Sequence, residues 1–312
     1  MDAPVTADVP RYPAAAPAGE LGPEALMAVL PEGELASDYQ WLSLHAWSPA
    51  ATVSQLDGAM VVGFTDYHDT SSRFYGFCGG HDPSAIARRL LHDAERVGWP
   101  AELRLVPEGT ACRLGDEFEV VEDRDNFDYL YDTHQVVELP GSAHHMNRKQ
   151  RNGFMRRHGA HHEVAVLPPA RADWESLVRL TERWADLAAD QDAAVDEIKA
   201  LIRCAETLSL HSDGHRAFVT QLAVDGKVVG FDISEVVGRD WALDHFRHTD
   251  HSVLGAHVVL RAAAAAHLVE RGVRTWNAEQ DLGVPGLRIR KERDRPSRLL
   301  RKYQVRLRTS SS

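Results

Sequence analysis

The sequence has no long hydrophobic run and few cysteines, and its first residues do not resemble a secretory signal. Residues 253–269 form the longest apolar stretch, but His257 and Arg261 interrupt it, whereas a membrane-spanning helix needs roughly 20 apolar residues. The 3 cysteines are far apart and odd in number, which is typical of a reducing compartment rather than of a disulfide framework. The start, Met-Asp-Ala-Pro, lacks a basic segment followed by an apolar core. We therefore expect a cytoplasmic protein with no stable membrane insertion.

Motifs that identify several common enzyme classes are also absent. There is no GxxxxGK[ST] phosphate loop, no GxGxxG after an expected strand, no GxSxG and no HExxH. The spacing of His245, His248 and His251 is a weak metal pattern, because three such residues on a strand-to-loop segment would not all point one way. We therefore expect no metal. Asp244 and His245 either line a pocket at a strand end or are ordinary hydrogen-bonded residues.

Hydrophobic periodicity predicts a mixed α/β (α+β) unit in the first half of the chain. Residues 1–20 are rich in Pro and Ala and predict a mobile tail, followed by a short helix at 23–30. From residue 39 to 77 the pattern changes to short β-rich runs. The expected strands are 60–64, 72–77, 103–106 and 118–121, and the expected helix is 84–97. The alternating aromatic run at 127–131 is typical of a half-buried strand.

The second half of the chain predicts the same kind of unit, so we expect two tandem domains with mixed sheets. Expected helices are 142–158, 172–187, 193–207 and 253–271, and expected strands are 162–167, 217–224, 227–236, 241–246 and 275–278. The domain boundaries follow from these elements. They are a tail with a short helix (1–35), an N-terminal domain (36–140), a basic connecting helix and strand (141–168) and a C-terminal domain (169–312).

Positive charge is concentrated in two segments of an otherwise acidic chain. The whole chain has 35 Lys and Arg against 46 Asp and Glu. Residues 288–308 hold ten Lys and Arg against only Glu292 and Asp294, and residues 144–162 hold five more beside five histidines and no acid. Because a local field steers association, these segments favour a phosphate-rich partner. The alternative is a solvated helix face and a basic tail.

The C-terminal basic segment belongs to a longer patterned stretch, residues 277–303. It begins with Glu279, Gln280 and Asp281, and it turns at Gly283 and at the Pro-Gly pair 285–286. Beyond residue 296 the spacing of apolar side chains predicts a short helix with one apolar side, formed by Leu299, Leu300 and Tyr303. Carboxylates beside many cations make this a place where an amine and a polyanion could meet.

This stretch resembles the signature of the phosphatidylglycerol lysyltransferase C-terminal-domain family, also called domain of unknown function 2156. The pattern NxEQDLGxxGLRxxKxxxxPxxxLxKY is present at Asn277, Glu279, Gln280, Asp281, Leu282, Gly283, Gly286, Leu287, Arg288, Lys291, Pro296, Leu300, Lys302 and Tyr303. A second block is similar at residues 127–132, Gly141, His145, Arg148, Asn152 and Phe154. The chain departs from the family at Met146-Asn147, where a Lys-Lys pair is usual, and at Asp294, where an aromatic residue is usual.

The resemblance implies two tandem GNAT-like domains, with acyl transfer in the second, and an aminoacyl-tRNA as the acyl donor. The expected function is a tRNA-dependent aminoacyltransferase acting on an amine or hydroxyl of a small molecule, as in the specialised metabolism of antibiotic biosynthesis. No bound cofactor is expected, because the charged tRNA is the co-substrate. Residues 251–256 form only an incomplete pyrophosphate grip at a helix start, which favours this donor over an acyl-CoA. Alternatives are aminoacylation of a membrane lipid, an acyl-CoA-dependent N-acyltransferase, and a non-catalytic RNA-binding module.

Site residues follow from the same stretches. Asp281 and Lys291 are the first candidates for catalysis, with Glu279 beside them, unless Asp281 and Lys291 form only a structural ion pair. Substrate-binding candidates are Asn277, Gln280, Arg288, Asp244 and His245. Candidates for contacts with tRNA phosphates are Arg148, Lys149, Arg151, Arg156, Arg157, Arg298, Arg301 and Lys302. The sequence does not specify the amino acid, the acceptor or the oligomeric state.

Overall fold

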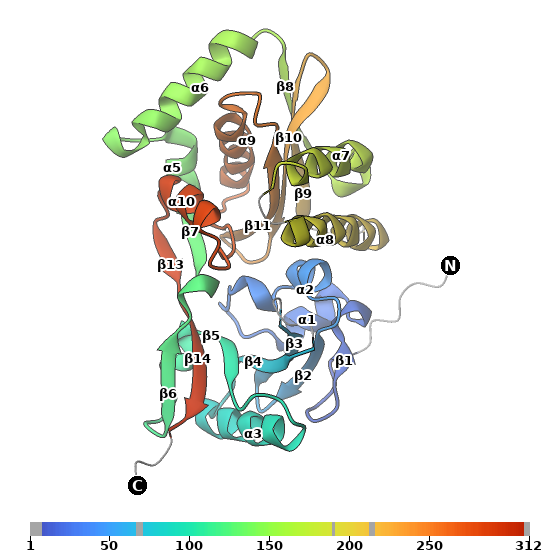
Figure 1. Cartoon of the computed structure of the whole chain (residues 1–312), viewed down its shortest axis with the longest axis vertical. Coiled ribbons are helices and arrows are strands. Elements are labelled where there is room, and N and C mark those ends of the chain that lie inside the picture. Colours follow the sequence, from blue (N-terminus) through green and yellow to red (C-terminus); the bar gives the residue numbers. More distant parts are fainter. Residues whose placement is uncertain (1–7, 67–70, 189–190, 212–215, 309–312) are drawn as a thin grey trace. The chain divides into compact units, whose positions relative to one another are not determined.

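The computed structural model describes residues 8–66, 71–188, 191–211 and 216–308 (Figure 1). The chain divides into two compact units, and it passes between them four times. Unit 1 comprises Met1–Asp128, Gln280–Arg290 and Leu299–Ser312, and unit 2 comprises Tyr129–Glu279 and Lys291–Arg298. This division differs from the expected boundaries, because the basic helix belongs to unit 2 and the C-terminal strand returns to unit 1.

Unit 1 contains a mixed seven-stranded sheet in the order β1-β2-β3-β4-β5-β14-β6. Its strands are β1 (Ala16–Pro17), β2 (Thr52–Leu56), β3 (Ala59–Thr65), β4 (Arg73–Gly79), β5 (Leu103–Pro107), β6 (Phe118–Glu122) and β14 (Lys302–Leu307). Its α-helices are α1 (Pro23–Val29), α2 (Trp41–Trp47), α3 (Pro83–Arg96) and α4 (Glu108–Ala111), and its 3-10 turns are η1 (Ala18–Glu20), η2 (Ser37–Tyr39) and η3 (Arg124–Asn126).

Helix α3 shows how the local sequence produces the packing of unit 1. Pro83 occupies the first turn, and the Asp82 carboxylate accepts a hydrogen bond from the Ala85 amide. Apolar side chains recur at helical spacing and are buried in a cluster with the sheet. That cluster includes Ile86, Ala87, Leu90 and Leu91 of the helix and Val61, Phe77, Leu103, Val106 and Val305 of the strands.

Unit 2 contains a second mixed sheet, in the order β13-β7-β12-β11-β10-β9-β8. Its strands are β7 (Asp128–Asp132), β8 (His162–Leu167), β9 (Ala217–Val224), β10 (Lys227–Val236), β11 (Trp241–Thr249), β12 (Thr275–Asn277) and β13 (Arg298–Leu300). Its helices are α5 (Thr133–Glu138), α6 (His145–His158), α7 (Trp174–Ala185), α8 (Gln191–Leu210) and α9 (Ala256–Glu270), with turns η4 (Ser142–His144) and η5 (Pro169–Arg171). Helix α10 (Pro285–Arg293) includes residues of both units.

The sheet of unit 2 is covered on both faces. Helix α9 packs on one face, while α7 and α8 lie on the other (Figure 1). Helix α6 lies beside α9, and the two pack against each other through Phe154, Ala256, Val259 and Leu260. This packing places the basic helix next to the start of α9.

The predicted fold class is confirmed, because two mixed sheets are each flanked by helices. The bounds of β8, β9 and β10 are those expected from the sequence, and α3, α6 and α9 agree within a few residues. Hydrophobic patterns and the hairpin turn at residues 225–226 were sufficient here to determine the bounds of these elements. In the described part of the chain, residues 8–66, 71–188, 191–211 and 216–308, no helix is long and apolar enough to cross a bilayer.

Several expectations about single segments were wrong. The predicted tail is ordered from residue 8, because Val9 is buried and Gln55 exchanges backbone hydrogen bonds with Pro10 and Tyr12; residues 1–7 lie outside the described residues. Residues 41–47, within the β-rich region, form helix α2. Strand β7 lies between β13 and β12, and its first four residues are all buried, so it is not the half-buried strand that the alternation predicted.

The segment after Pro296 forms strands and not the expected helix. Strand β14 pairs in an antiparallel manner with both β5 and β6, so its backbone is bonded on both edges. Apolar spacing could not distinguish the two conformations, since Val305 is buried in the core of unit 1 from a strand position. Helix α10 instead lies before this proline.

Candidate functional site

The acidic half of the signature stretch is anchored inside unit 1 by arginines. The Asp281 side chain is fully buried, and its two oxygens accept hydrogen bonds from Arg288 Nε at 2.9 Å and Nη2 at 2.8 Å. Arg124 Nη1 adds a third contact at 3.1 Å, and the Gly283 amide donates to Oδ1 at 2.9 Å. The paired carboxylates of Asp281 and Asp125 raise the pKa of Arg288 above its usual value. This bidentate arrangement holds the turn before α10 in place.

Gln280 and Lys302 take part in a second buried cluster of unit 1. Lys302 Nζ lies 2.7 Å from Asp128 Oδ1 and also pairs with Asp38. Burial alone would lower the pKa of Lys302, but Asp128 and Asp38 raise it above its usual value. Gln280 Nε2 donates to Asp38 Oδ1 at 3.0 Å. Lys302 is therefore inside the unit, and we remove it from the predicted contacts with tRNA.

In unit 2, a histidine lies between two carboxylates. His245 Nδ1 is 3.1 Å from Glu279 Oε1, and Nε2 is 3.1 Å from Glu235 Oε2. Although burial alone would lower the pKa of His245, its hydrogen bonds to the two glutamates raise that pKa to about 9. The imidazole is thus protonated near neutral pH. Asn277 shapes the turn that supplies Glu279, because its Oδ1 accepts from the Glu279 amide at 2.7 Å.

Two local features of the sheet create this arrangement. Strands β11 and β12 run parallel but pair only as far as Leu243 and Asn277, whereas β11 continues to Thr249. The pairing of β10 with β11 also shifts at Ile233/Ser234, which leaves His245 as an extra residue in a bulge. Parting strands and bulges redirect side chains and are frequent next to active sites. The backbone of Glu279 has a φ of +56°, so the chain turns sharply where it leaves β12.

Asp244 and His245 lie inside strand β11 rather than at a strand end, which corrects that part of the prediction. Asp244 pairs with Arg247 on the same strand. Lys291, predicted to act with Asp281, belongs to the other unit, and its Nζ donates to the Ala278 carbonyl oxygen. Its own carbonyl accepts from the Tyr131 hydroxyl at 2.7 Å. Asp281 and Lys291 therefore each have partners within their own unit.

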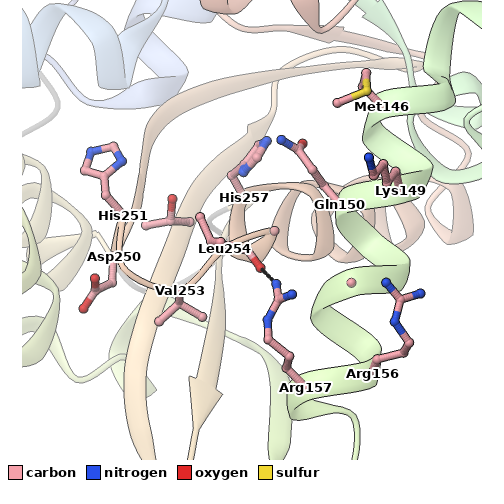
Figure 2. A pocket seen from close by; sticks show the side chains of 13 residues that line it. Met146, Lys149, Gln150, Arg156, Arg157, Asp250, His251, Val253, Leu254 and His257 are labelled. Atoms are coloured by element: carbon pink, nitrogen blue, oxygen red, sulfur yellow. Dashed lines mark hydrogen bonds between the residues drawn. The ribbon is translucent and has the colours of Figure 1, made fainter.

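A cavity of about 410 Å³ lies in unit 2 between α6 and the turn that precedes α9 (Figure 2). Figure 2 shows Lys149, Arg156 and Arg157 on the helix side and His251 and Leu254 on the turn side. The other residues that line the cavity are Met146, Gln150, Gly153, Thr249, Asp250, Val253, Gly255 and His257. Three cations beside a helix N-terminus favour an anionic ligand.

Close packing fixes the turn of this cavity against α6. Arg157 Nη2 donates to the Leu254 carbonyl oxygen at 2.6 Å (Figure 2). Gly255 has a φ of +89°, and a Cβ atom there would lie 2.5 Å from the Gln150 carbonyl oxygen. Only glycine combines this backbone angle with so close an approach. The α6–α9 cavity thus has a rigid wall.

Some of the other side chains predicted to contact tRNA instead bind groups of the protein itself, whereas others have no such partner. Arg148 donates to the carbonyl oxygens of Leu139 and Gly141, and Arg151 donates to that of Val137. Arg298 lies over the Trp241 ring at 5.4 Å. In unit 1, Arg301 is half exposed and lies 2.8 Å from Glu122. By contrast, the side chains of Lys149 and Arg156 have no hydrogen bond or ion pair within the part of the chain that the structure describes.

The sequence did not indicate several polar residues of unit 2. Glu235, the second partner of His245, lies ten positions away on β10, and Arg261 lies on α9. Neither belongs to a recognisable motif, because the strands that bring them together are joined by hairpins of ordinary sequence. A buried Arg261 in an otherwise apolar helix was the one available signal.

The two mixed sheets, each flanked by helices, define a protein of the mixed α/β class with two compact units in tandem. The profile of the family described as "Phosphatidylglycerol lysyltransferase, C-terminal" matches residues 33–306. The chain belongs to this family. The match covers both units and therefore includes the signature stretch and the His245 site.

Solved structures show the same fold at low sequence identity. A conserved protein of unknown function from Bacteroides thetaiotaomicron VPI-5482 is 22% identical, with a TM-score of 0.77, over 92% of this chain and 96% of that chain. The structure of L-PGS from Bacillus licheniformis is 15% identical, with a TM-score of 0.62, over 98% and 95%. FemX is 11% identical, with a TM-score of 0.54, over 92% and 95%. No curated protein sequence matches the chain.

Proposed function

We propose that this protein is an aminoacyltransferase that takes an amino acid from a charged tRNA and passes it to an amine or hydroxyl of a small molecule. Family membership supports transfer of an aminoacyl group. The proposal that the donor is a charged tRNA rests on the α6–α9 cavity, which is lined by the cations Lys149, Arg156 and Arg157 beside the start of α9. The phosphates at the 3′ end of a tRNA fit this arrangement of charge.

The chemistry requires no covalent enzyme intermediate, because the aminoacyl ester is already activated. The acceptor nitrogen or oxygen attacks the ester carbonyl carbon, and the bond to the terminal ribose oxygen breaks. A base removes the acceptor's proton, and the ribose oxygen takes up a proton as it leaves. We assign base function to Glu279, whose side chain retains 15% exposure beside the protonated His245. Asp281 is assigned a positioning role, because it is fully buried against Arg288.

The donor can be tested with a total tRNA pool charged with radiolabelled amino acids. We expect the purified protein to deacylate one charged species selectively and to transfer its label to a pool of small amines. Replacing Lys149 and Arg156 together with Ala should lower the affinity for that tRNA at least tenfold. It should also reduce the slope of log affinity against log salt, by roughly 0.7 to 0.9 for each phosphate that the variant no longer neutralises.

A matched control is Arg271→Ala, since Arg271 is an exposed cation at the C-terminal end of α9, whereas the cavity lies at the N-terminal end of that helix. This variant should bind and transfer like the wild-type protein. Consumption of acetyl-CoA with no preference among charged tRNAs would overturn the proposed donor. Label recovered in phosphatidylglycerol vesicles but in no small amine would overturn the proposed acceptor.

A further inference from the structure

Unit 2 contains buried polar atoms that the fold leaves without hydrogen-bond partners. Asp232 on β10, Asp244 on β11, Arg261 on α9 and Trp276 on β12 are each more than nine-tenths buried. Among the described residues, no hydrogen-bond partner exists for Asp232 Oδ2, Asp244 Oδ1, Arg261 Nε and Nη2, or Trp276 Nε1. Each buried group of this kind costs roughly 1 to 3 kcal/mol, so native proteins seldom keep several together without a ligand or water.

Three of these residues are connected through Arg247, and Arg261 joins them at the Trp276 ring, while its Nε also lies 3.7 Å from Asp294 Oδ2 in an ion pair. Arg247 pairs with Asp244, and its Nε lies 3.5 Å from Asp232 Oδ2. The guanidinium carbons of Arg247 and Arg261 lie 5.0 Å and 5.8 Å from the centre of the Trp276 ring. We call Asp232, Asp244, Arg261 and Trp276 the polar cluster. It lies between the sheet and α9, where β11 parts from β12.

The atoms of the polar cluster that lack hydrogen bonds are of two complementary kinds. Asp232 and Asp244 offer acceptor oxygens, whereas Arg261 and Trp276 offer N–H donors. An α-amino acid ester presents the matching pair, because its ammonium donates and its carbonyl oxygen accepts. An acetyl group presents only the carbonyl. Water could also satisfy both kinds of group, and this is the competing explanation.

We infer that the polar cluster binds the head group of the donor amino acid, with its α-ammonium at Asp232 and Asp244 and its carbonyl oxygen at Arg261 and Trp276. This inference rests on the proposed function and adds what the site requires of its substrate. The guanidinium and indole N–H groups also stabilise the negative charge that develops on the carbonyl oxygen during attack. The consequence is selectivity, because a donor without the ammonium leaves two buried carboxylate oxygens without a hydrogen-bond donor.

The test compares two donors that differ in a single group. The charged tRNA that the wild-type protein deacylates is treated with nitrous acid, which replaces the α-ammonium with a hydroxyl. We expect the hydroxyacyl-tRNA to be used at least 100-fold less efficiently, as kcat/KM, than the aminoacyl-tRNA. Equal use of both donors would overturn the inference and assign the cluster to ordered water. Failure to use either donor would instead overturn the proposed function.

Substitutions then test which residues produce the preference for the aminoacyl donor over the hydroxyacyl donor. Asp232→Asn and Asp244→Asn keep the side-chain shape and should reduce the preference for the aminoacyl donor at least tenfold. Ser54→Ala is the control, because Ser54 is also a buried polar residue on a strand, but that strand belongs to the sheet of unit 1, whereas the polar cluster belongs to unit 2. It should keep the wild-type preference. If the Asn variants fail to fold, the comparison of donors with the wild-type protein still decides the question. An unchanged preference in folded Asn variants would place the ammonium elsewhere.

Discussion

Glu279 and His245 are 34 positions apart in the sequence, yet their side chains lie 3.1 Å apart where β11 and β12 separate. The contact depends on the β11 bulge at His245 and on the positive φ of Glu279. Glu235 completes the arrangement from β10. A buried imidazolium with two carboxylates leaves one net negative charge, which suits a site that receives a proton from an amine acceptor.

The ionisation of His245 predicts a loss of stability at alkaline pH. Its pKa is about 9 in the folded protein and 6.5 in the reference state, so the stabilising charge is fully present below pH 6.5 and is lost as pH rises through 9. The difference corresponds to roughly 3 kcal/mol. His245→Gln should remove this part of the pH dependence. Urea unfolding of both proteins at pH 6 and pH 10 measures it, and identical pH dependence in the two would contradict the assignment.

Lys302 should contribute to folding and not to polyanion binding. Lys302→Met leaves Asp38 and Asp128 buried without their cation, which should lower the free energy of unfolding by roughly 3 to 5 kcal/mol. Arg301→Met is the neighbouring control. Its side chain is half exposed, so loss of the Glu122 pair should lower the free energy of unfolding far less than loss of Lys302 does. Denaturant titration of both variants gives the values, and a reversed order would refute the placement of Lys302.

The sequence predicted the fold better than it predicted the site. Strands such as β9 and β10 alternate or are continuously apolar, so their periodicity determined their bounds. The signature stretch was also identified, but the roles of its residues depend on partners from distant segments. Lys302 carries a charge in a basic run and is nevertheless buried, because Asp38 and Asp128 approach it from other elements. Pairing of this kind has no local signal in a single sequence.

The importance of the close contact between Gly255 and α6 can be tested by comparing alanine substitutions at two glycines. Gly255→Ala introduces a Cβ atom at a φ of +89° and 2.5 Å from the Gln150 carbonyl oxygen, so α6 must move. Gly272→Ala has the same type of backbone angle, with a φ of +77°, but meets no atom within 4 Å. The second change should cost about 1 kcal/mol and leave tRNA binding intact. The first should cost more and weaken binding at least tenfold, as measured by filter binding. Equal tRNA binding by both variants would show that the contact between Gly255 and α6 is not needed for tRNA binding.

Substitution of Asp281 separates a positioning role of this residue from a catalytic one. Asp281→Asn keeps an oxygen for the Gly283 amide but removes the charge that Arg288 and Arg124 share. Because Asp281 is fully buried, we expect a loss of roughly 3 kcal/mol in the free energy of unfolding together with a lower kcat. A positioning role predicts that the pH at half-maximal rate stays where it is in the wild-type protein, since the base is elsewhere. Glu279→Gln should behave in the opposite way. Its free energy of unfolding should fall less, and its plot of rate against pH should lack the inflection on the acid side. If instead Asp281→Asn abolished that inflection in a fully stable protein, Asp281 would be the base and Glu279 only its neighbour.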